Sequence, residues 1–180
     1  MRGLLFTEYL DFVEERLGSH ALEDVIQGLD GRITAAYTSV GNYSFDEFAL
    51  LHGAICKEMK ADAAVLARDY GYHLFGRFET MFPEYFAGID SGVALLEKLG
   101  RHIHEEVKKL YPDAKPPQVL LIAGDGGDLV LEYISHRPLA AVARGLTDAC
   151  LDHFGDAHRI MEEKAVPGGM HFILKKQRDG

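Results

Sequence analysis

The hydrophobic pattern of this 180-residue chain changes its period once, at Pro116 and Pro117. Over about the first 110 residues, apolar side chains recur every three to four positions, which is typical of amphipathic helices. After the proline pair, short runs rich in β-branched and aromatic residues are separated by turn-forming residues, which indicates strands. The chain is therefore predicted to be an α+β protein. A helical N-terminal half is expected to pack on a C-terminal half that holds a four-stranded antiparallel sheet and a covering helix.

Helix boundaries in the first half are marked by capping and helix-breaking residues. Ser44 and Glu47 form a capping-box pattern at the start of one helix, and Pro83 and Pro112 end two others. The predicted helical segments are a first one around Leu4–Val13 that stops at Gly18, then Ala21–Leu29, a helix opened by Ser44, Ala63–Phe82 and Ser91–Leu110.

Two hairpins and one helix are predicted in the second half. Gly124 to Asp128 is a strong turn signal between two predicted strands, and Pro167 to Gly169 is a second one. Pro138 fits the first turn of a helix that runs to Phe154. The predicted strands are Val119–Ala123, Leu129–Ser135, His158–Val166 and Met170–Lys175.

Charge and cysteine content narrow the functional classes. The net charge of −9 argues against a nucleic-acid surface, which needs clustered lysine and arginine. Cys56 and Cys150 are the only two cysteines, too few for a disulfide framework or a four-cysteine zinc site, and both are expected to be small buried residues. No apolar run is long enough to span a membrane, and the N-terminal apolar stretch is too short for a signal peptide, so the expected location is cytoplasmic.

His102 and His104 lie in a predicted helix, which separates their roles. At about 100° per residue their rings diverge by roughly 200°, so a metal shared by the two is not expected. His104 falls on the flank of the apolar stripe, whereas His102 falls among charged residues. Gly100, one turn before His104, leaves room for a flat group. A core histidine bonded to a carbonyl remains an open alternative for His104.

Tyr133, Ser135 and Arg137 alternate along a predicted strand and would share one face with Leu129 and Leu131. Such a face is apolar at one end and binds anions at the other, because arginine holds a carboxylate in bidentate geometry and hydroxyls complete its hydrogen bonding. An apolar macrocycle with carboxylates at one edge, such as haem, suits this polarity. A strand with a polar, exposed end is the alternative interpretation.

The usual catalytic signatures do not occur in the sequence. There is no zinc-protease His-Glu-x-x-His, no nucleophile elbow and no phosphate-binding P-loop. The glycine-rich segment from Gly124 to Asp128 carries two acids, which would repel phosphate. The protein is therefore not expected to be an enzyme.

Several motifs resemble the haem–nitric oxide/oxygen binding (H-NOX) family, the bacterial relatives of the haem domain of soluble guanylate cyclase. They are the run from Ile103 through His104 to Pro117, the Tyr133-x-Ser135-x-Arg137 motif, the Met1 to Phe6 start, the Tyr37 to Tyr43 segment, and Gly145-Leu with His153-Phe-Gly155. The resemblance implies a single haem domain over residues 1–180, with a distal helical subdomain at 1–60 and a proximal subdomain at 61–180. Haem b (iron protoporphyrin IX) would lie between them.

The resemblance also implies a role for each site residue. His104 would be the axial ligand of the haem iron, and Tyr133, Ser135 and Arg137 would hold the propionates. Pro117 would press on the porphyrin. The residues expected near the macrocycle or on its gas-binding side are Leu5, Leu74, Phe78, Val142 and Leu146.

Selectivity between gases is expected to follow from hydrogen-bond donors on the gas-binding side. Family members that hold oxygen stably place a tyrosine in the helix after the Tyr-x-Ser-x-Arg strand, and the matching position here is Val142. Bound oxygen is polarised and needs a donor, whereas NO binds ferrous iron tightly without one. The pattern therefore favours NO. Tyr9, one turn beyond Leu5, is the alternative source of a hydroxyl.

The resulting hypothesis is an NO sensor in which NO loosens the bond between iron and His104 and a partner protein reads the change. The resemblance implies a histidine kinase or a cyclic-di-GMP enzyme as that partner, with no nucleic acid or membrane involved. The zinc-site cysteines that some relatives carry near the C-terminus are absent from residues 162–171. An oxygen sensor, a haem peroxidase and a cofactor-free interaction domain remain the alternatives.

Overall fold

The computed structural model describes residues 1–99, 109 and 115–177. Within these residues the chain divides into two compact units, Met1–Tyr70 and Gly71–Gly180. The division falls inside helix α4 (Ala63–Met81). The predicted boundary at residues 60 and 61 remains a prediction. None of the helices in the described parts is both long and apolar enough to cross a membrane.

The first unit is helical and has an aromatic core. It contains α1 (Gly3–Leu17), α2 (Ser19–Gly28), α3 (Phe45–Met59) and the start of α4. Phe6, Tyr9 and Phe12 are fully buried on one side of α1, at the i, i+3 spacing of a helix face. Tyr70 on α4 contacts the Tyr9 ring, with centroids 5.0 Å apart. The predicted helices of this unit are thus confirmed, with small shifts at their ends.

Ser44 caps α3, but the predicted capping box does not form. The Ser44 hydroxyl accepts a hydrogen bond from the Asp46 backbone N–H at 2.9 Å. Glu47 does not reach back to Ser44. Its carboxylate accepts from the Thr34 backbone N–H at 2.8 Å and from the Tyr37 hydroxyl at 3.2 Å. The box prediction was wrong because donors from the preceding loop compete for the Glu47 carboxylate, and these hydrogen bonds hold the pKa of Glu47 below its usual value although burial acts to raise it.

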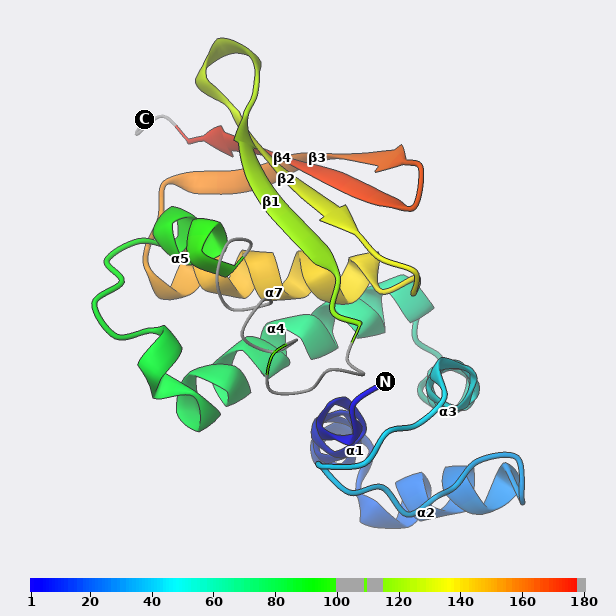
Figure 1. The fold of residues 1–180 in the computed structure, drawn as a ribbon. Helices are drawn as coiled ribbons and strands as arrows, with labels where there is room; N and C mark the ends of the chain where they lie inside the picture. The colour runs from blue at the N-terminus through cyan, green and yellow to red at the C-terminus, as the bar shows by residue number, and fades with distance from the viewer. Residues whose placement is uncertain (100–108, 110–114, 178–180) are drawn as a thin grey trace. The chain divides into compact units, whose positions relative to one another are not determined.

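A four-stranded antiparallel sheet forms the centre of the second unit, in the order β1-β2-β4-β3. Helices α5 (Gly92–Lys98) and α7 (Ala140–His153) cover one face of it (Figure 1). The strands are β1 (Gln118–Ala123), β2 (Leu129–Ile134), β3 (His158–Val166) and β4 (Gly169–Lys176). The α+β class and the two predicted hairpins are confirmed. Cys56 and Cys150 are both free and buried, as expected.

Short helical turns add detail that the sequence pattern did not predict. A 3-10 turn, Pro83–Tyr85, follows α4, and another, Asp125–Gly127, lies between β1 and β2. Pro138 is not in the first turn of α7, because the Leu139 N–H donates to the Arg137 carbonyl at 2.8 Å and closes a tight turn first. The helix therefore begins two residues after the proline.

Candidate functional site

Tyr133 lies near the end of β2, in the interior of the sheet. β2 pairs with β1 on one side and β4 on the other, so Tyr133 is opposite Val119 and Met170. Its side chain is 5% exposed and belongs to the apolar core of the second unit, together with Leu131. The alternation predicted for this strand therefore holds for Leu131 and Tyr133.

Ser135 and Arg137 follow the strand instead of continuing it. β2 ends at Ile134, although the Ser135 N–H still donates to the Gly168 carbonyl at 2.9 Å. The chain then turns, and the Arg137 N–H donates to the Ser135 hydroxyl at 3.1 Å. The prediction that all three residues share one face of an extended strand was wrong in this detail, because hydroxyl-to-backbone hydrogen bonds favour a turn over a strand.

The Tyr133 and Ser135 side chains are nevertheless hydrogen bonded, and the charge of Arg137 acts on Tyr133. Burial raises the pKa of Tyr133, and a hydrogen bond with Ser135 and the positive charge of Arg137 partly offset that rise. Tyr133 therefore stays protonated. The three residues place two hydroxyls and a guanidinium at the end of an apolar strand.

Arg137 also contacts the segment before β1. Its Nη1 donates to the Lys115 carbonyl at 3.2 Å, next to Pro116 and Pro117. A guanidinium has five N–H donors, so this bond leaves most of them for another acceptor. Within the described part of the chain Arg137 has no carboxylate partner. This donor set suits the carboxylates of a porphyrin.

Two helices of the second unit carry the residues predicted for the gas-binding side. Leu74 and Phe78 are one turn apart on α4, and Val142 and Leu146 are one turn apart on α7. Leu74 and Val142 are buried, whereas Phe78 and Leu146 are partly buried. All four side chains are hydrocarbons, so none of them can donate a hydrogen bond.

Gly71 brings these two helices into direct backbone contact. A Cβ atom at Gly71 would stand 2.1 Å from the Val142 carbonyl oxygen, which is closer than any side chain permits. The absence of a side chain thus allows α4 and α7 to touch at the start of the Leu74 turn. The hydrophobic pattern of the sequence did not indicate this contact. A glycine inside a predicted helix was the available signal, since such a glycine often marks close packing.

The remaining predicted residues are less fully described. Pro117 is partly buried just before β1, and Leu5 is partly buried on α1 in the first unit. The Leu5 carbonyl accepts a hydrogen bond from the buried Tyr70 hydroxyl at 2.7 Å. His104 lies outside the described residues. Within the described residues, no group of three or more His, Cys, Asp and Glu side chains could hold a metal ion.

Tyr9 has a partner that the sequence did not reveal. Its hydroxyl lies 2.7 Å from Nδ1 of His52, and Nε2 of the same ring lies 3.0 Å from the Ala63 carbonyl. Because a carbonyl only accepts, Nε2 carries the hydrogen of a neutral ring, and Nδ1 accepts from Tyr9. Burial raises the pKa of Tyr9, with a contribution from Cys56, and burial also lowers the pKa of His52. The Tyr9 hydroxyl therefore donates its only hydrogen to His52, within the first unit.

The end of β2 offers two hydroxyls and a guanidinium with several unused donors, and α4 and α7 carry hydrocarbon side chains. These features define a domain suited to an amphipathic ligand with acidic groups. Comparison with known proteins specifies that class further. The sequence profile described as Haem-NO-binding matches residues 2–162, and the chain belongs to this family. Domains of the family bind haem and diatomic gases such as NO, and the chain has the fold of an H-NOX haem-based gas sensor.

Solved structures of bacterial H-NOX proteins resemble the whole chain. The unliganded Fe(II) H-NOX protein from K. algicida is 27% identical, with a TM-score of 0.88 over 99% of this chain and 98% of that one. The H-NOX protein from S. oneidensis in its Fe(II)NO state is 20% identical, with a TM-score of 0.86 over 99% and 100% of the two chains, and supports the fold alone. No curated protein sequence matches.

Proposed function

We propose that this chain is an NO-selective, haem-based sensor that binds haem b through His104 and signals to a separate partner protein. Tyr133, Ser135 and Arg137 would hold the propionates, and Pro117 would contact the porphyrin. Leu5 would lie near the macrocycle, and Leu74, Phe78, Val142 and Leu146 would line the gas-binding side. Haem would supply the iron to which the gas binds, and the chain itself would have no catalytic role.

The observation that carries the preference for NO is the hydrogen bond between Tyr9 and His52. From the sequence, Tyr9 is the alternative source of a hydroxyl that could donate to bound oxygen. With its proton donated to His52 at 2.7 Å, Tyr9 has no donor left for a ligand. The other residues proposed for the gas-binding side are hydrocarbons. A site without donors favours NO over oxygen, because only oxygen depends strongly on a donated hydrogen bond.

The signal would be the loss of the bond between His104 and iron when NO binds. A ligand can change the conformation of a protein only if it has different contacts in the two states, and this bond would be present in one state only. A change around His104 would then be read by a partner. A histidine kinase or a cyclic-di-GMP enzyme acting in trans is the partner we propose.

Absorption spectra of the ferrous protein test the proposal directly. Protein expressed with haem supplementation should be coloured, should form no persistent oxygen complex in air, and should give a stable NO complex. A lasting oxygen complex would reject NO selectivity, and a colourless protein would reject the haem site. Peroxide turnover above that of free haem would instead indicate a peroxidase.

Replacement of His104 tests the axial ligand. His104→Gly should lose most haem affinity, and added imidazole should restore it by filling the space left by the side chain. The matched control is His102→Gly, because His102 lies on the predicted charged side of the same helix and should keep its haem. Equal haem affinity in the two variants would contradict the assignment.

A further inference from the structure

β1 lies at one edge of the four-stranded sheet, because the strand order is β1-β2-β4-β3 (Figure 1). It pairs with β2 in one continuous antiparallel register, without a bulge. Within the described part of the chain, only this side of β1 is paired. An edge strand presents a row of backbone N–H and C=O groups to which another strand can bond.

The hydrogen bonds of the hairpin show which residues of β1 point to its open side. The Gly124 N–H donates to the Asp128 carbonyl at 2.9 Å, in line with the β1–β2 register. Antiparallel ladders alternate between residues that bond to the paired strand and residues that point away from it. The even-numbered residues of β1 therefore bond to β2, and the backbone groups on the open side belong to Val119, Leu121 and Ala123. No other described segment forms a backbone hydrogen bond with them.

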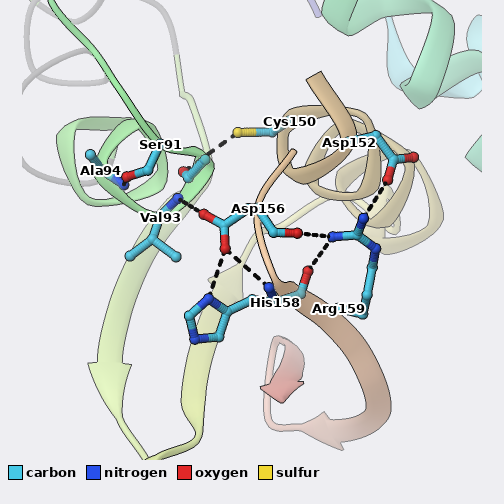
Figure 2. A network of polar contacts seen from close by, with 9 residues as sticks. Ser91, Val93, Ala94, Cys150, Asp152, Asp156, His158 and Arg159 are labelled. Carbon is cyan, nitrogen blue, oxygen red and sulfur yellow. Dashed lines mark hydrogen bonds and ion pairs between the residues drawn. The ribbon is translucent and has the colours of Figure 1, made fainter. Parts of the chain in front are cut away.

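The opposite edge strand, β3, is protected against pairing with another chain. Arg159, near its start, pairs with Asp152 near the end of α7 at 3.3 Å, as Figure 2 shows. A bulge between Ile160 and Glu162 then interrupts its register with β4. Every residue from 162 to 164 is charged. Bulges and charges are the features by which proteins keep an edge strand from accepting a further strand.

β1 has none of these protective features. Its sequence, Gln-Val-Leu-Leu-Ile-Ala, holds no charged residue and no proline. Ile122 is 39% exposed, and Ala123 next to it is exposed as well. Pro116 and Pro117 precede the strand and have no N–H to donate, so a ladder cannot extend past them. The open edge therefore runs from just after Pro117 to the turn that starts at Gly124.

Charges at the two ends of β1 favour a second copy of the same strand as the occupant of this edge. Lys115 is exposed before the strand, and Asp125 is exposed after it. In an antiparallel pair of β1 strands, Lys115 of each copy would lie beside the turn that holds Asp125 of the other. A parallel pair would instead bring like charges together. Since β1 itself is uncharged, the net charge of −9 on each chain opposes contact less at this edge than at a charged surface.

One register pairs the whole strand with its copy. With Leu121 opposite Leu121 of the second copy on a two-fold axis, Val119 is opposite Ala123, and every outward backbone group of β1 has a partner. On the face of the sheet away from α5 and α7, Leu120 would lie opposite Ile122. A two-fold contact of this kind closes on itself, so it gives a dimer and no filament.

We propose that two copies of this chain form a symmetric dimer by antiparallel pairing of their β1 strands, which joins the two sheets into one. The backbone hydrogen bonds of Val119, Leu121 and Ala123 would hold the strands together. Leu120 and Ile122 would bury apolar surface across the contact, and the Lys115 and Asp125 charges would fix the antiparallel direction.

Sedimentation equilibrium of the full chain measures the dimer. The wild type should pass from monomer to dimer as its concentration rises through the micromolar range. Ile122→Lys should raise the dissociation constant about tenfold or more, because the two-fold axis sets two added charges against Leu120 of the opposite copy. A chain that stays monomeric at every concentration would overturn the proposal and leave the edge to a strand of a different protein.

Met161→Lys is the matched control for Ile122→Lys. Met161 is a 61% exposed apolar residue on the other edge strand, and the change in charge is the same. This variant should dimerise like the wild type. Circular dichroism and thermal unfolding show that both variants are folded before they are compared. Equal weakening of the dimer by the two variants would overturn the assignment to β1.

A charge exchange tests the direction of the pairing. Lys115→Glu should weaken the dimer, because it places two acids beside each other at both ends of the contact. Lys115→Glu combined with Asp125→Lys should restore the wild-type dissociation constant. A double variant as weak as the single one would overturn the antiparallel arrangement.

Hydrogen exchange resolved to single amides distinguishes strand pairing from any other contact between copies. Dimer formation should slow exchange of the amides that point to the open side, those of Val119, Leu121 and Ala123. The amides of Leu120 and Ile122 already bond to β2 and should change little. A dimer that leaves the open-side amides unprotected would lie on another surface, and the proposal would be overturned.

Discussion

Gly71 and Val142 make a backbone contact that leaves no room for a side chain, since a Cβ atom on Gly71 would lie 2.1 Å from the Val142 carbonyl oxygen. That oxygen belongs to the backbone of α7, so the clash cannot be relieved by a rotamer change. Gly71→Ala should therefore separate α4 from α7 and lower the free energy of unfolding by about 1–3 kcal/mol, as overpacking does.

Gly76→Ala is the matched control, because Gly76 lies on the same helix with nothing within 4 Å of its would-be Cβ atom. It should raise stability by up to about 1 kcal/mol through helix propensity alone. Urea unfolding of the two variants checks both values. Equal effects would mean that the Gly71 contact does not matter for packing.

Most of the fold could be predicted from the sequence because each helix and hairpin is marked by a pattern within a short segment. The helices show apolar residues at helical spacing, and the two hairpins are marked by glycine-rich turns. The motif residues Tyr133, Ser135 and Arg137 were also found from the sequence. Their arrangement was predicted less well, since the turn after Ile134 depends on which backbone donor the Ser135 hydroxyl meets.

Contacts between distant segments could not be predicted, because no local pattern encodes them. Tyr9 and His52 are 43 residues apart, and Asp156 and Val93 are 63 apart. Each pair needs the packed core to bring a donor and an acceptor together. The same applies to Glu47, which fits a local capping pattern but accepts hydrogen bonds from Thr34 and Tyr37 instead.

Removal of the Tyr9 hydroxyl should affect stability but not gas selectivity. Tyr9→Phe leaves Nδ1 of His52 without its partner in a largely buried site, which should cost about 1–3 kcal/mol. The variant should still form a stable NO complex and no lasting oxygen complex. Urea unfolding and ferrous spectra in air measure the two effects.

Tyr37→Phe serves as the comparison for Tyr9→Phe, since the Tyr37 hydroxyl bonds to the partly exposed carboxylate of Glu47, where water can replace it. A smaller loss of stability is expected there. A change in oxygen binding in Tyr9→Phe would mean that the Tyr9 hydroxyl donates to the bound gas. That result would contradict the hydrogen bond from Tyr9 to His52.

Arg137 should contribute to haem affinity through its charge. Arg137→Met keeps much of the side-chain length but removes the guanidinium, and should weaken haem binding about ten- to a hundredfold, as loss of a charge-assisted hydrogen bond does. Arg159→Met is the control, because Arg159 pairs with Asp152 in the same unit. The rate of haem transfer to an acceptor globin measures the difference. Similar transfer rates in the two variants would argue against a propionate at Arg137.

Asp156 should make the stability of the protein depend on pH in the acid range. Burial acts to raise its pKa, but the hydrogen bonds from His158 and Val93 outweigh it and hold the pKa of this carboxyl below its usual 3.8. A carboxyl whose pKa is lower in the folded state binds protons more readily when unfolded. Its contribution is therefore fully present above the unfolded pKa and is lost as the pH falls through the folded one.

Asp156→Asn removes this titration and keeps the size of the side chain. Urea unfolding from about pH 5 down to about pH 3 should show the wild type losing more stability than the variant, so that the two curves converge at low pH. Asp152→Asn, which changes an exposed carboxylate near the end of α7, should follow the wild type more closely. Parallel curves for wild type and Asp156→Asn would mean that the hydrogen bonds from His158 and Val93 do not favour the charged carboxylate of Asp156.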